Sequence, residues 1–203
     1  MSAAARVRRA GVAVLAAAAL IALTGCTSDP LAEQYREGSN KGYIAADGTV
    51  TEFDLESRGD PVAFSGTTEN GDEVSSADFA GEVLVLNFWY AGCAPCRLEA
   101  PDLQELNEKY DGAGASFLGV NVRDQPANAT SFNKTYGVTY PSIMDVEKGS
   151  VKLAFSSNVP ANAVPTTIVL DAEGRVAARI LGQVTDPSIL DTLIRDTIAE
   201  GKR

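Results

Sequence analysis

The chain has 203 residues, contains no histidine and carries a formal net charge of −10 at pH 7. Without histidine, the chain has no imidazole metal ligand, no histidine haem ligand and no nucleophile activated by a histidine base. Such an acidic surface repels phosphate backbones, so we expect no nucleic-acid partner.

The N-terminal segment has the features of a secretory signal. A basic region with three arginines at 6–9 precedes a small and apolar stretch at 10–22, which is too short to span a bilayer as a mature helix. The stretch ends in Leu23-Thr24-Gly25-Cys26, which resembles a bacterial lipobox, although an ordinary secretory signal with a chance cysteine is the alternative. We expect a lipoprotein signal peptide at 1–25 and a lipid on Cys26 that anchors the protein to the outer face of the cell membrane.

The next segment, residues 26–60, is polar and rich in glycine, with no sustained apolar period. It is predicted to be a tether that holds one folded domain, residues 61–203, away from the membrane. The domain is predicted to begin with a hairpin over Val62–Val74, because Asn70-Gly71 is a typical hairpin turn.

The centre of the chain alternates between predicted strands and helices. The continuous apolar run Val83–Trp89 is typical of a buried parallel strand, and leucines at helical spacing predict a helix from Pro95 to about Tyr110 that contains Pro101. A second buried strand is expected at 115–122. The remaining predicted elements are a helix at 127–136, a short helical segment at 150–155, a strand at 166–170, a turn at 171–174, an antiparallel strand at 176–181 and a closing helix marked by Ile189, Leu193 and Ile198.

The motif Cys93-Ala94-Pro95-Cys96 follows the first of these strands. Cys93 falls at a helix N-terminus, where unpaired N–H groups favour an exposed thiolate nucleophile, whereas Cys96 lies one turn further in, is expected to be more buried and should resolve the mixed disulfide. A structural bridge over so short a loop would constrain little of the unfolded chain, and a zinc site would need two more ligands that the mature chain lacks. We therefore expect a redox-active Cys93–Cys96 disulfide with no metal and no other cofactor.

The run from Asn87 to Glu99 resembles the thioredoxin-like ResA/TlpA/CcmG group of extracytoplasmic thiol-disulfide oxidoreductases. Further likeness is found in Gly119-Val120-Asn121-Val122 and in Val164-Pro165-Thr166-Thr167, and it extends over roughly 61–199. The resemblance implies an α/β thioredoxin-like fold with a central mixed β-sheet flanked by helices. It also implies an N-terminal β-hairpin and a helical insertion at 124–155.

The resemblance assigns roles to further residues. Pro165 should be a cis-proline, which leaves the backbone of Val164 free to pair with an extended substrate strand; an ordinary trans proline is the alternative. Glu99 matches the glutamate of the group, and a buried carboxyl there has a raised pKa and can shuttle protons, whereas a solvated helix-face glutamate would not. Asn87 stands where cytosolic thioredoxins carry a buried aspartate.

One position departs from the group. Its members commonly place a tryptophan just before the first cysteine, where this chain has Gly92. Tyr90 is the candidate to replace that aromatic surface in substrate binding. Trp89 is expected to pack under the site, with a role in substrate binding and a plain core role both open.

The resemblance implies an enzyme that reduces disulfides in exported proteins such as apocytochromes c, with electrons from a membrane dithiol carrier. An oxidant that introduces disulfides into secreted proteins is the first alternative, and the direction of electron flow stays open. A thiol peroxidase is a weaker alternative, because Tyr90 occupies the position where peroxidatic cysteines normally have a threonine. A non-catalytic binding module is the last, and the intact cysteine pair argues against it.

Overall fold

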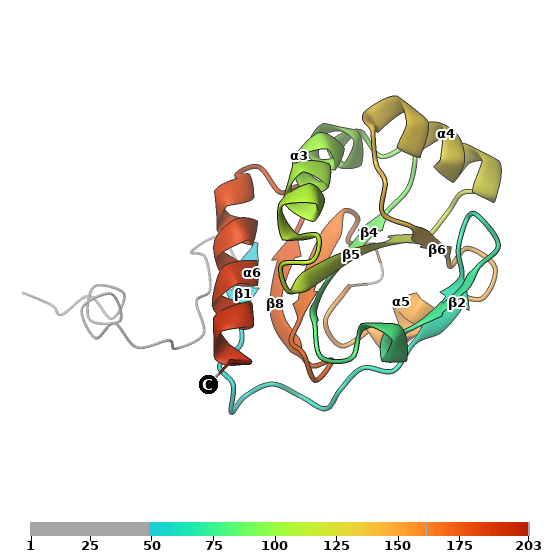
Figure 1. Ribbon diagram of the computed structural model, residues 1–203. Helices are drawn as coiled ribbons and strands as arrows, with labels where there is room; N and C mark the ends of the chain where they lie inside the picture. The colour runs from blue at the N-terminus through green and yellow to red at the C-terminus, as the bar shows by residue number, and fades with distance from the viewer. Residues whose placement is uncertain (1–48, 161, 203) are drawn as a thin grey trace, which may run out of the picture. The chain divides into compact units, whose positions relative to one another are not determined.

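The computed structural model describes residues 49–160 and 162–202. They form a six-stranded mixed sheet in the order β1-β8-β7-β4-β5-β6, a separate hairpin of β2 and β3, and the helices around them (Figure 1). The predicted signal peptide and the lipidation of Cys26 lie outside the described residues. The strands are β1 (Val50–Glu52), β2 (Ser65–Thr67), β3 (Glu73–Ser75), β4 (Val83–Trp89), β5 (Ala115–Asn121), β6 (Ser142–Met144), β7 (Thr166–Leu170) and β8 (Val176–Leu181). The helices are the 3₁₀ helix η1 (Ser76–Phe79) and α3 (Ala94–Tyr110), α4 (Pro126–Tyr136), α5 (Ser150–Ala154) and α6 (Pro187–Glu200).

Strand β4 is the centre of the sheet, and all seven of its residues are buried. It pairs in parallel with β5 and antiparallel with β7. Successive side chains of a strand point to opposite faces, so β4 supplies two cores. Val85 and Trp89 belong to one core, under α3 and α6, whereas Leu86 and Phe88 belong to the other, under α5 and the hairpin. Coverage on both faces explains the continuous apolar run of the sequence.

The helices that cover the first core use faces that differ in part from those predicted. Leu193 is buried as expected, but Ile189 is 41% exposed while its neighbour Leu190 is fully buried. In α3, Leu98 was expected on the apolar face and is 66% exposed, because the buried face of that helix turns toward α6 and the sheet. Figure 1 shows α3 and α6 side by side on this face.

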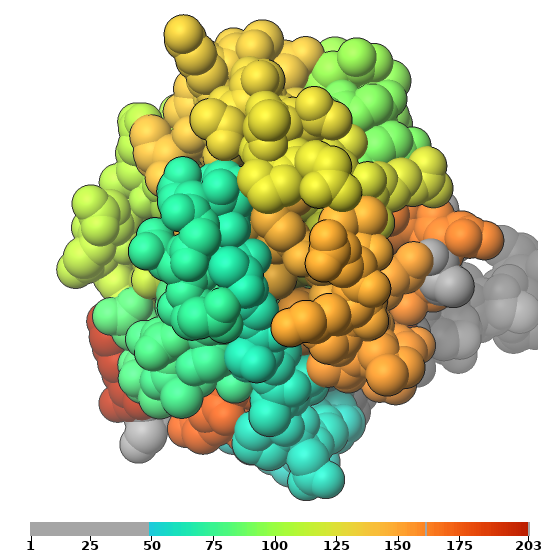
Figure 2. Space-filling model, turned by 90° about the vertical axis from the view of Figure 1, so that its right-hand side faces the viewer, coloured from blue at the N-terminus to red at the C-terminus, as the bar shows by residue number. Residues whose placement is uncertain are grey.

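The predicted hairpin around Asn70-Gly71 is confirmed, with Gly71 in a left-handed conformation at φ 91°. It contacts the far edge of the main sheet, because Thr68 forms a bridge with Ile143 of β6 and the amide of Glu69 donates to the carbonyl of Ser142. Figure 2 shows the hairpin lying against the segment that contains α5. The segment predicted as a helical insertion therefore also holds strand β6, which the sequence analysis missed.

The domain begins before residue 61, in contrast to the predicted boundary. Strand β1 pairs antiparallel with β8 and forms one edge of the main sheet. Its three residues carry too little apolar pattern to stand out, and the pairing is with a strand more than 120 residues away. Arg58 reinforces the attachment, because its buried guanidinium pairs with Asp171 at 3.1 Å and Glu200 at 2.6 Å. In the part of the chain that the structure describes, no helix has the length and apolar character needed to cross a membrane.

Candidate active site

The two cysteines lie where β4 passes into α3. The strand ends at Trp89, a short loop follows, and Cys93 is the N-cap of the helix, so that Cys93 and Cys96 occupy its first turn. They form a disulfide with a Cα–Cα distance of 5.3 Å, and Cys93 Sγ accepts a hydrogen bond of 3.2 Å from the amide of Cys96. Pro95 suits this turn because its missing N–H would have had no partner within the helix.

Burial does not distinguish the two cysteines in this oxidised form. Cys93 is 3% exposed and Cys96 is 2% exposed, so the prediction of a more exposed Cys93 does not hold here. What separates them is their place on the helix. Cys93 sits at the end, where the N–H group of the first turn already points at its sulfur and favours a negative charge on it.

The loop before Cys93 is held by a second loop at the end of β5. Asp124 accepts hydrogen bonds from the amide of Ala91 at 2.6 Å and from the side chain of Asn121 at 2.8 Å. The guanidinium of Arg123 lies over the ring of Tyr90, 4.3 Å from its centroid. The sequence analysis did not find these contacts, although an Asn followed closely by an Asp after a buried strand is a typical turn signal. Tyr90 is half-buried beside the dithiol, so its predicted contact with substrate stays a prediction.

Glu99 is fully buried one helical turn after Cys96. Its carboxylate accepts hydrogen bonds from the side chain of Asn87 at 2.9 Å and from the amide of Val184 at 2.8 Å. Burial raises the pKa of Glu99 to about 7; these two hydrogen bonds lower it, whereas the negative charge of Asp102 adds to the rise. The alternative of a solvated glutamate on the helix surface is excluded, and the carboxyl group can take up or release a proton near neutral pH.

The Val164–Pro165 peptide bond is cis, as predicted. Val164 is half-buried and packs against the core cluster that includes both cysteines. The carbonyl of Pro165 is occupied, because it accepts a hydrogen bond from the amide of Gly182. The proposed pairing of the Val164 backbone with a substrate strand stays a prediction.

Trp89 is a core residue rather than part of a substrate-facing surface. It is 4% exposed, its ring packs on Phe132 with centroids 4.3 Å apart, and its Nε1 donates to Ser142 Oγ at 3.1 Å. The position of the residue explains this result. As the last residue of β4, its side chain points to the same face as Val85, where α3 and α4 cover it.

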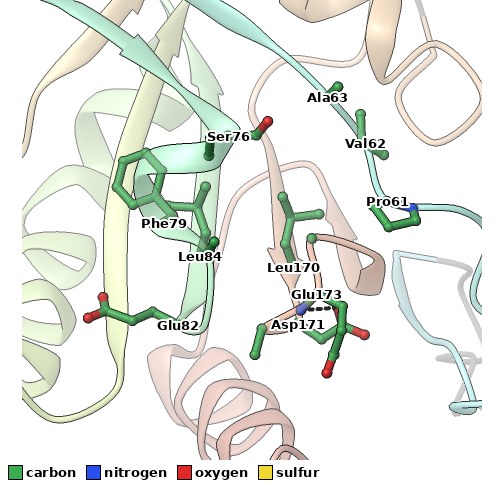
Figure 3. A pocket seen from close by; sticks show the side chains of 14 residues that line it. Pro61, Val62, Ala63, Ser76, Phe79, Glu82, Leu84, Leu170, Asp171 and Glu173 are labelled. Carbon is green, nitrogen blue, oxygen red and sulfur yellow. Dashed lines mark hydrogen bonds between the residues drawn. The ribbon is translucent and has the colours of Figure 1, made fainter.

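A hollow lies at the end of β4 opposite to Trp89, beside Leu84. It measures about 220 Å³ and is lined mainly by apolar side chains, with Val62 and Phe79 on either side of Leu170 (Figure 3). None of the predicted site residues lines it. Among the described residues, no group of three or more acidic or sulfur side chains is placed to hold a metal ion.

A family model described as Redoxin matches residues 47–194, which is more than half of the chain. The chain belongs to the redoxin family. Among solved structures of similar proteins, a DsbF homologue from Corynebacterium diphtheriae is 39% identical, with a TM-score of 0.66 over 76% of this chain and 97% of that one. A secreted thiol-disulfide isomerase from Corynebacterium glutamicum is 34% identical, with a TM-score of 0.68 over 78% of this chain and 99% of that one.

The thiol-disulfide oxidoreductase ResA of Bacillus subtilis is 30% identical over 122 residues, which are 60% of this chain and 65% of ResA. The alignment thus spans just under two thirds of that relative. These likenesses confirm the thioredoxin-like α/β fold and the relationship to ResA-type proteins. The Cys93–Cys96 disulfide of this redoxin lies at a helix N-terminus, a position from which a disulfide can exchange with the thiols of another protein.

Proposed function

We propose that this redoxin reduces disulfides in exported proteins, with apocytochromes c as the leading substrate class, and that a membrane dithiol carrier supplies its electrons. The observation that carries the proposal is the buried Glu99 carboxyl one turn from Cys96, with a pKa near 7. A reductase must deprotonate its second thiol on each turnover, and a base that titrates near neutral pH suits that step. The 30% identity to ResA supports the same class of enzyme.

The proposed reaction has two exchanges. The thiolate of Cys93 attacks a substrate disulfide, forms a mixed disulfide and releases one substrate thiolate, which takes a proton from water. Glu99 then accepts the proton of the Cys96 thiol, and the Cys96 sulfur attacks Cys93 Sγ. The second substrate thiolate leaves, and the two electrons have passed from the cysteine pair to the substrate. The product is the Cys93–Cys96 disulfide of this structure, which the membrane carrier would reduce again.

A role in oxidation or isomerisation is the second candidate, because the neighbour from Corynebacterium glutamicum is called a thiol-disulfide isomerase. The two directions differ in the reduction potential of the pair. The reduction potential of thioredoxin is about −270 mV, and that of the oxidant DsbA is about −120 mV. No histidine lies between the two cysteines of this chain, and the motif ends in Pro95-Cys96 as in thioredoxin, which favours the reducing end.

Equilibration of the protein in dithiothreitol and glutathione buffers tests the direction. A potential near the thioredoxin end, together with reduction of a disulfide in an apocytochrome c peptide, would support the proposal. A potential near the DsbA end, with efficient oxidation of a reduced secreted protein, would overturn it in favour of the second candidate.

We also propose that the protein acts outside the cytoplasm, held to the membrane by a lipid on Cys26. The Leu23-Thr24-Gly25-Cys26 sequence and its preceding apolar stretch support this location. Mass spectrometry of the mature N-terminus should show a diacylglyceryl group on Cys26, and Cys26→Ala should release the protein from membranes. A mature chain that begins elsewhere, with an unmodified Cys26, would contradict the lipid anchor.

A further inference from the structure

A small cavity lies beside Cys96, between the sheet and the helices α3 and α4. Its volume is about 10 Å³, which is room for a single water molecule. Cys96 of α3 and Trp89 of β4 contribute to its wall, and its polar lining comes from β4, α4, β6 and the loop before β6. These polar residues are Asn87, Asn133, Tyr140 and Ser142.

One of these lining residues, Asn133, has a side-chain oxygen without a hydrogen-bond partner. Asn133 Nδ2 donates a hydrogen bond of 2.9 Å to the carboxylate of Glu69, whereas Asn133 Oδ1 is buried and receives no hydrogen bond. The orientation of the amide is fixed, because a carboxylate only accepts and the NH₂ group must therefore face Glu69. A buried acceptor without a donor is costly, and a bound water is the usual remedy.

Glu69 belongs to the hairpin turn and holds two sides of the cavity together. One of its carboxylate oxygens accepts from Asn133 of α4, and the other accepts from the amide of Ser142 of β6 at 2.8 Å. Ser142 in turn accepts from Trp89 Nε1 at 3.1 Å. The hairpin, which lies outside the main sheet, thus holds two of the polar residues of the cavity, Asn133 and Ser142, in place.

The backbone below the cavity is shaped for these contacts. Asn87, Gly119 and Ser142 are directly paired in register across β4, β5 and β6. A Cβ atom on Gly119 would overlap Ser142 Oγ and lie 2.8 Å from Trp89 Nε1. Only a glycine at this position lets the serine and the indole meet over the strand.

We propose that this cavity binds one water molecule, that Glu69 positions the water through Asn133, and that the water hydrogen-bonds to the Cys96 thiol whenever the disulfide is open. One O–H group of the water would donate a hydrogen bond to Asn133 Oδ1, and the other would donate a hydrogen bond to the sulfur of Cys96. Donation to sulfur stabilises the thiolate that forms when Cys96 attacks Cys93, so the water would aid exchange in either direction of electron flow.

The titratable groups near Cys96 come from several elements. Cys93 is the N-cap of α3, and Glu99 belongs to α3, as Cys96 does. Tyr140 lies in the loop before β6, and Glu69 lies in the turn of the hairpin. Burial raises the pKa of Tyr140, and the negative charge of Glu99 raises it further, so Tyr140 remains a neutral hydroxyl beside the cavity. Glu99 accepts hydrogen bonds from Asn87 and Val184 and does not line this cavity, so its proposed uptake of the Cys96 proton and the proposed water are separate contributions.

A crystal structure of the oxidised protein tests the first half of the proposal. We expect electron density for one water within hydrogen-bond distance of Asn133 Oδ1, on the side of Cys96. A well-ordered cavity without such density would overturn the proposal.

The second half is tested with the full chain carrying Cys26→Ser and Cys93→Ser, in which Cys96 is the one remaining thiol of the three cysteines. Asn133→Leu removes the acceptor while keeping its approximate size. We expect it to raise the pKa of Cys96, measured from the pH dependence of alkylation, by about one unit, which is tenfold less thiolate at a fixed pH below the pKa. Asn128→Leu is the matched control, because Asn128 is an exposed asparagine on the same helix, and it should leave that pKa unchanged.

Glu69→Gln, in the turn of the hairpin, provides a second variant in case Asn133→Leu fails to fold. Its amide cannot accept from both Asn133 and Ser142, so the pKa of Cys96 should rise in the same direction by a smaller amount. A purely structural role would lower the melting temperature without moving this pKa. Equal pKa values in the parent and both cavity variants would overturn the proposed role of the water.

Discussion

The side chain of Asn87 donates a hydrogen bond of 2.9 Å to Glu99 and thereby joins the centre of β4 to the helix that carries both cysteines. The second hydrogen on the same nitrogen is taken by Thr167 Oγ1 at 3.1 Å on the neighbouring strand. The buried carboxyl of Glu99 is thus held by neutral donors and not by a cation. Neutral donors offset only part of the cost of burying a charge, which is why its pKa rises.

This arrangement predicts that Glu99 makes stability depend on pH. The pKa of Glu99 rises from its ordinary value of 4.5 to about 7 on folding, so the folded protein binds more protons between these values. The free energy of unfolding should therefore fall as pH rises through that window, by about 3 kcal/mol from this group. Glu99→Gln should remove this pH-dependent loss of stability. The variant should also be less stable than the parent by an amount that does not change with pH, because the NH₂ group of glutamine cannot accept one of the two hydrogen bonds that Glu99 accepts.

Urea unfolding of the parent and of Glu99→Gln, at about pH 4 and about pH 8, measures the effect. The parent should lose about 3 kcal/mol more than the variant between these conditions. Parallel losses in the two proteins would show that Glu99 has a similar pKa in the folded and unfolded chains.

The place of Cys93 at the helix N-terminus predicts the order of the two exchanges. In a Cys26→Ser background, Cys96→Ser should trap a mixed disulfide with a substrate protein through Cys93. Cys93→Ser should trap little, because the Cys96 sulfur lies inside the first turn and away from the end of the helix. Non-reducing electrophoresis with mass spectrometry of the adduct measures both variants. A stronger adduct on Cys96 would reverse the assignment, which burial alone leaves open at 3% and 2% exposure.

Local patterns in the sequence were sufficient to predict the elements with strong periodicity and chemistry. The bounds of Val83–Trp89 agree with strand β4, and the predicted helix after Cys93 differs from α3 by one residue at its start. The cysteine motif and the following glutamate are encoded within seven residues, so their proximity follows from two successive turns of one helix. The prediction of a cis bond at Pro165 came from the family resemblance, with support from the β-rich Thr-Thr-Ile-Val sequence that follows it.

Features that depend on distant parts of the chain were not predictable in this way. Strands β1 and β6 have three residues each and exist because β8 and β5 offer them partners. The contact of Glu69 with Asn133 joins residues 64 positions apart and depends on how the hairpin folds over the sheet. Trp89 packs under the site as expected, but its partners Phe132 and Ser142 belong to α4 and β6, which the strand pattern alone does not specify.

The close approach at Gly119 predicts a specific cost for a single methyl group. Gly119→Ala should force Ser142 Oγ and Trp89 Nε1 apart and lower the free energy of unfolding by about 1–3 kcal/mol. Trp89 is the one tryptophan of the chain, so its fluorescence emission should also shift when its hydrogen bond to Ser142 is lost.

Gly59→Ala is the matched control for this substitution, since no heavy atom lies within 4 Å of the added methyl group. It should leave the free energy of unfolding unchanged or raise it by less than about 1 kcal/mol. Equal stabilities for the two alanine variants, with the same emission spectrum, would contradict the tight packing at Gly119.

The guanidinium of Arg58 predicts how firmly the segment after β1 is bound to the domain. It is 2% exposed and bridges Asp171 to Glu200, and its Nε donates to the carbonyl of Phe53 at 3.1 Å. Arg58→Met should lower the free energy of unfolding by about 3 kcal/mol, because it leaves carboxylates behind with fewer partners in a buried site. Arg195→Met is the control, since Arg195 pairs with Asp196 where both side chains are more than half exposed, and it should cost less than about 1 kcal/mol. Urea denaturation at neutral pH measures both, and a loss for Arg58→Met no larger than that of the control would mean that the segment before residue 61 contributes little to the stability of the fold.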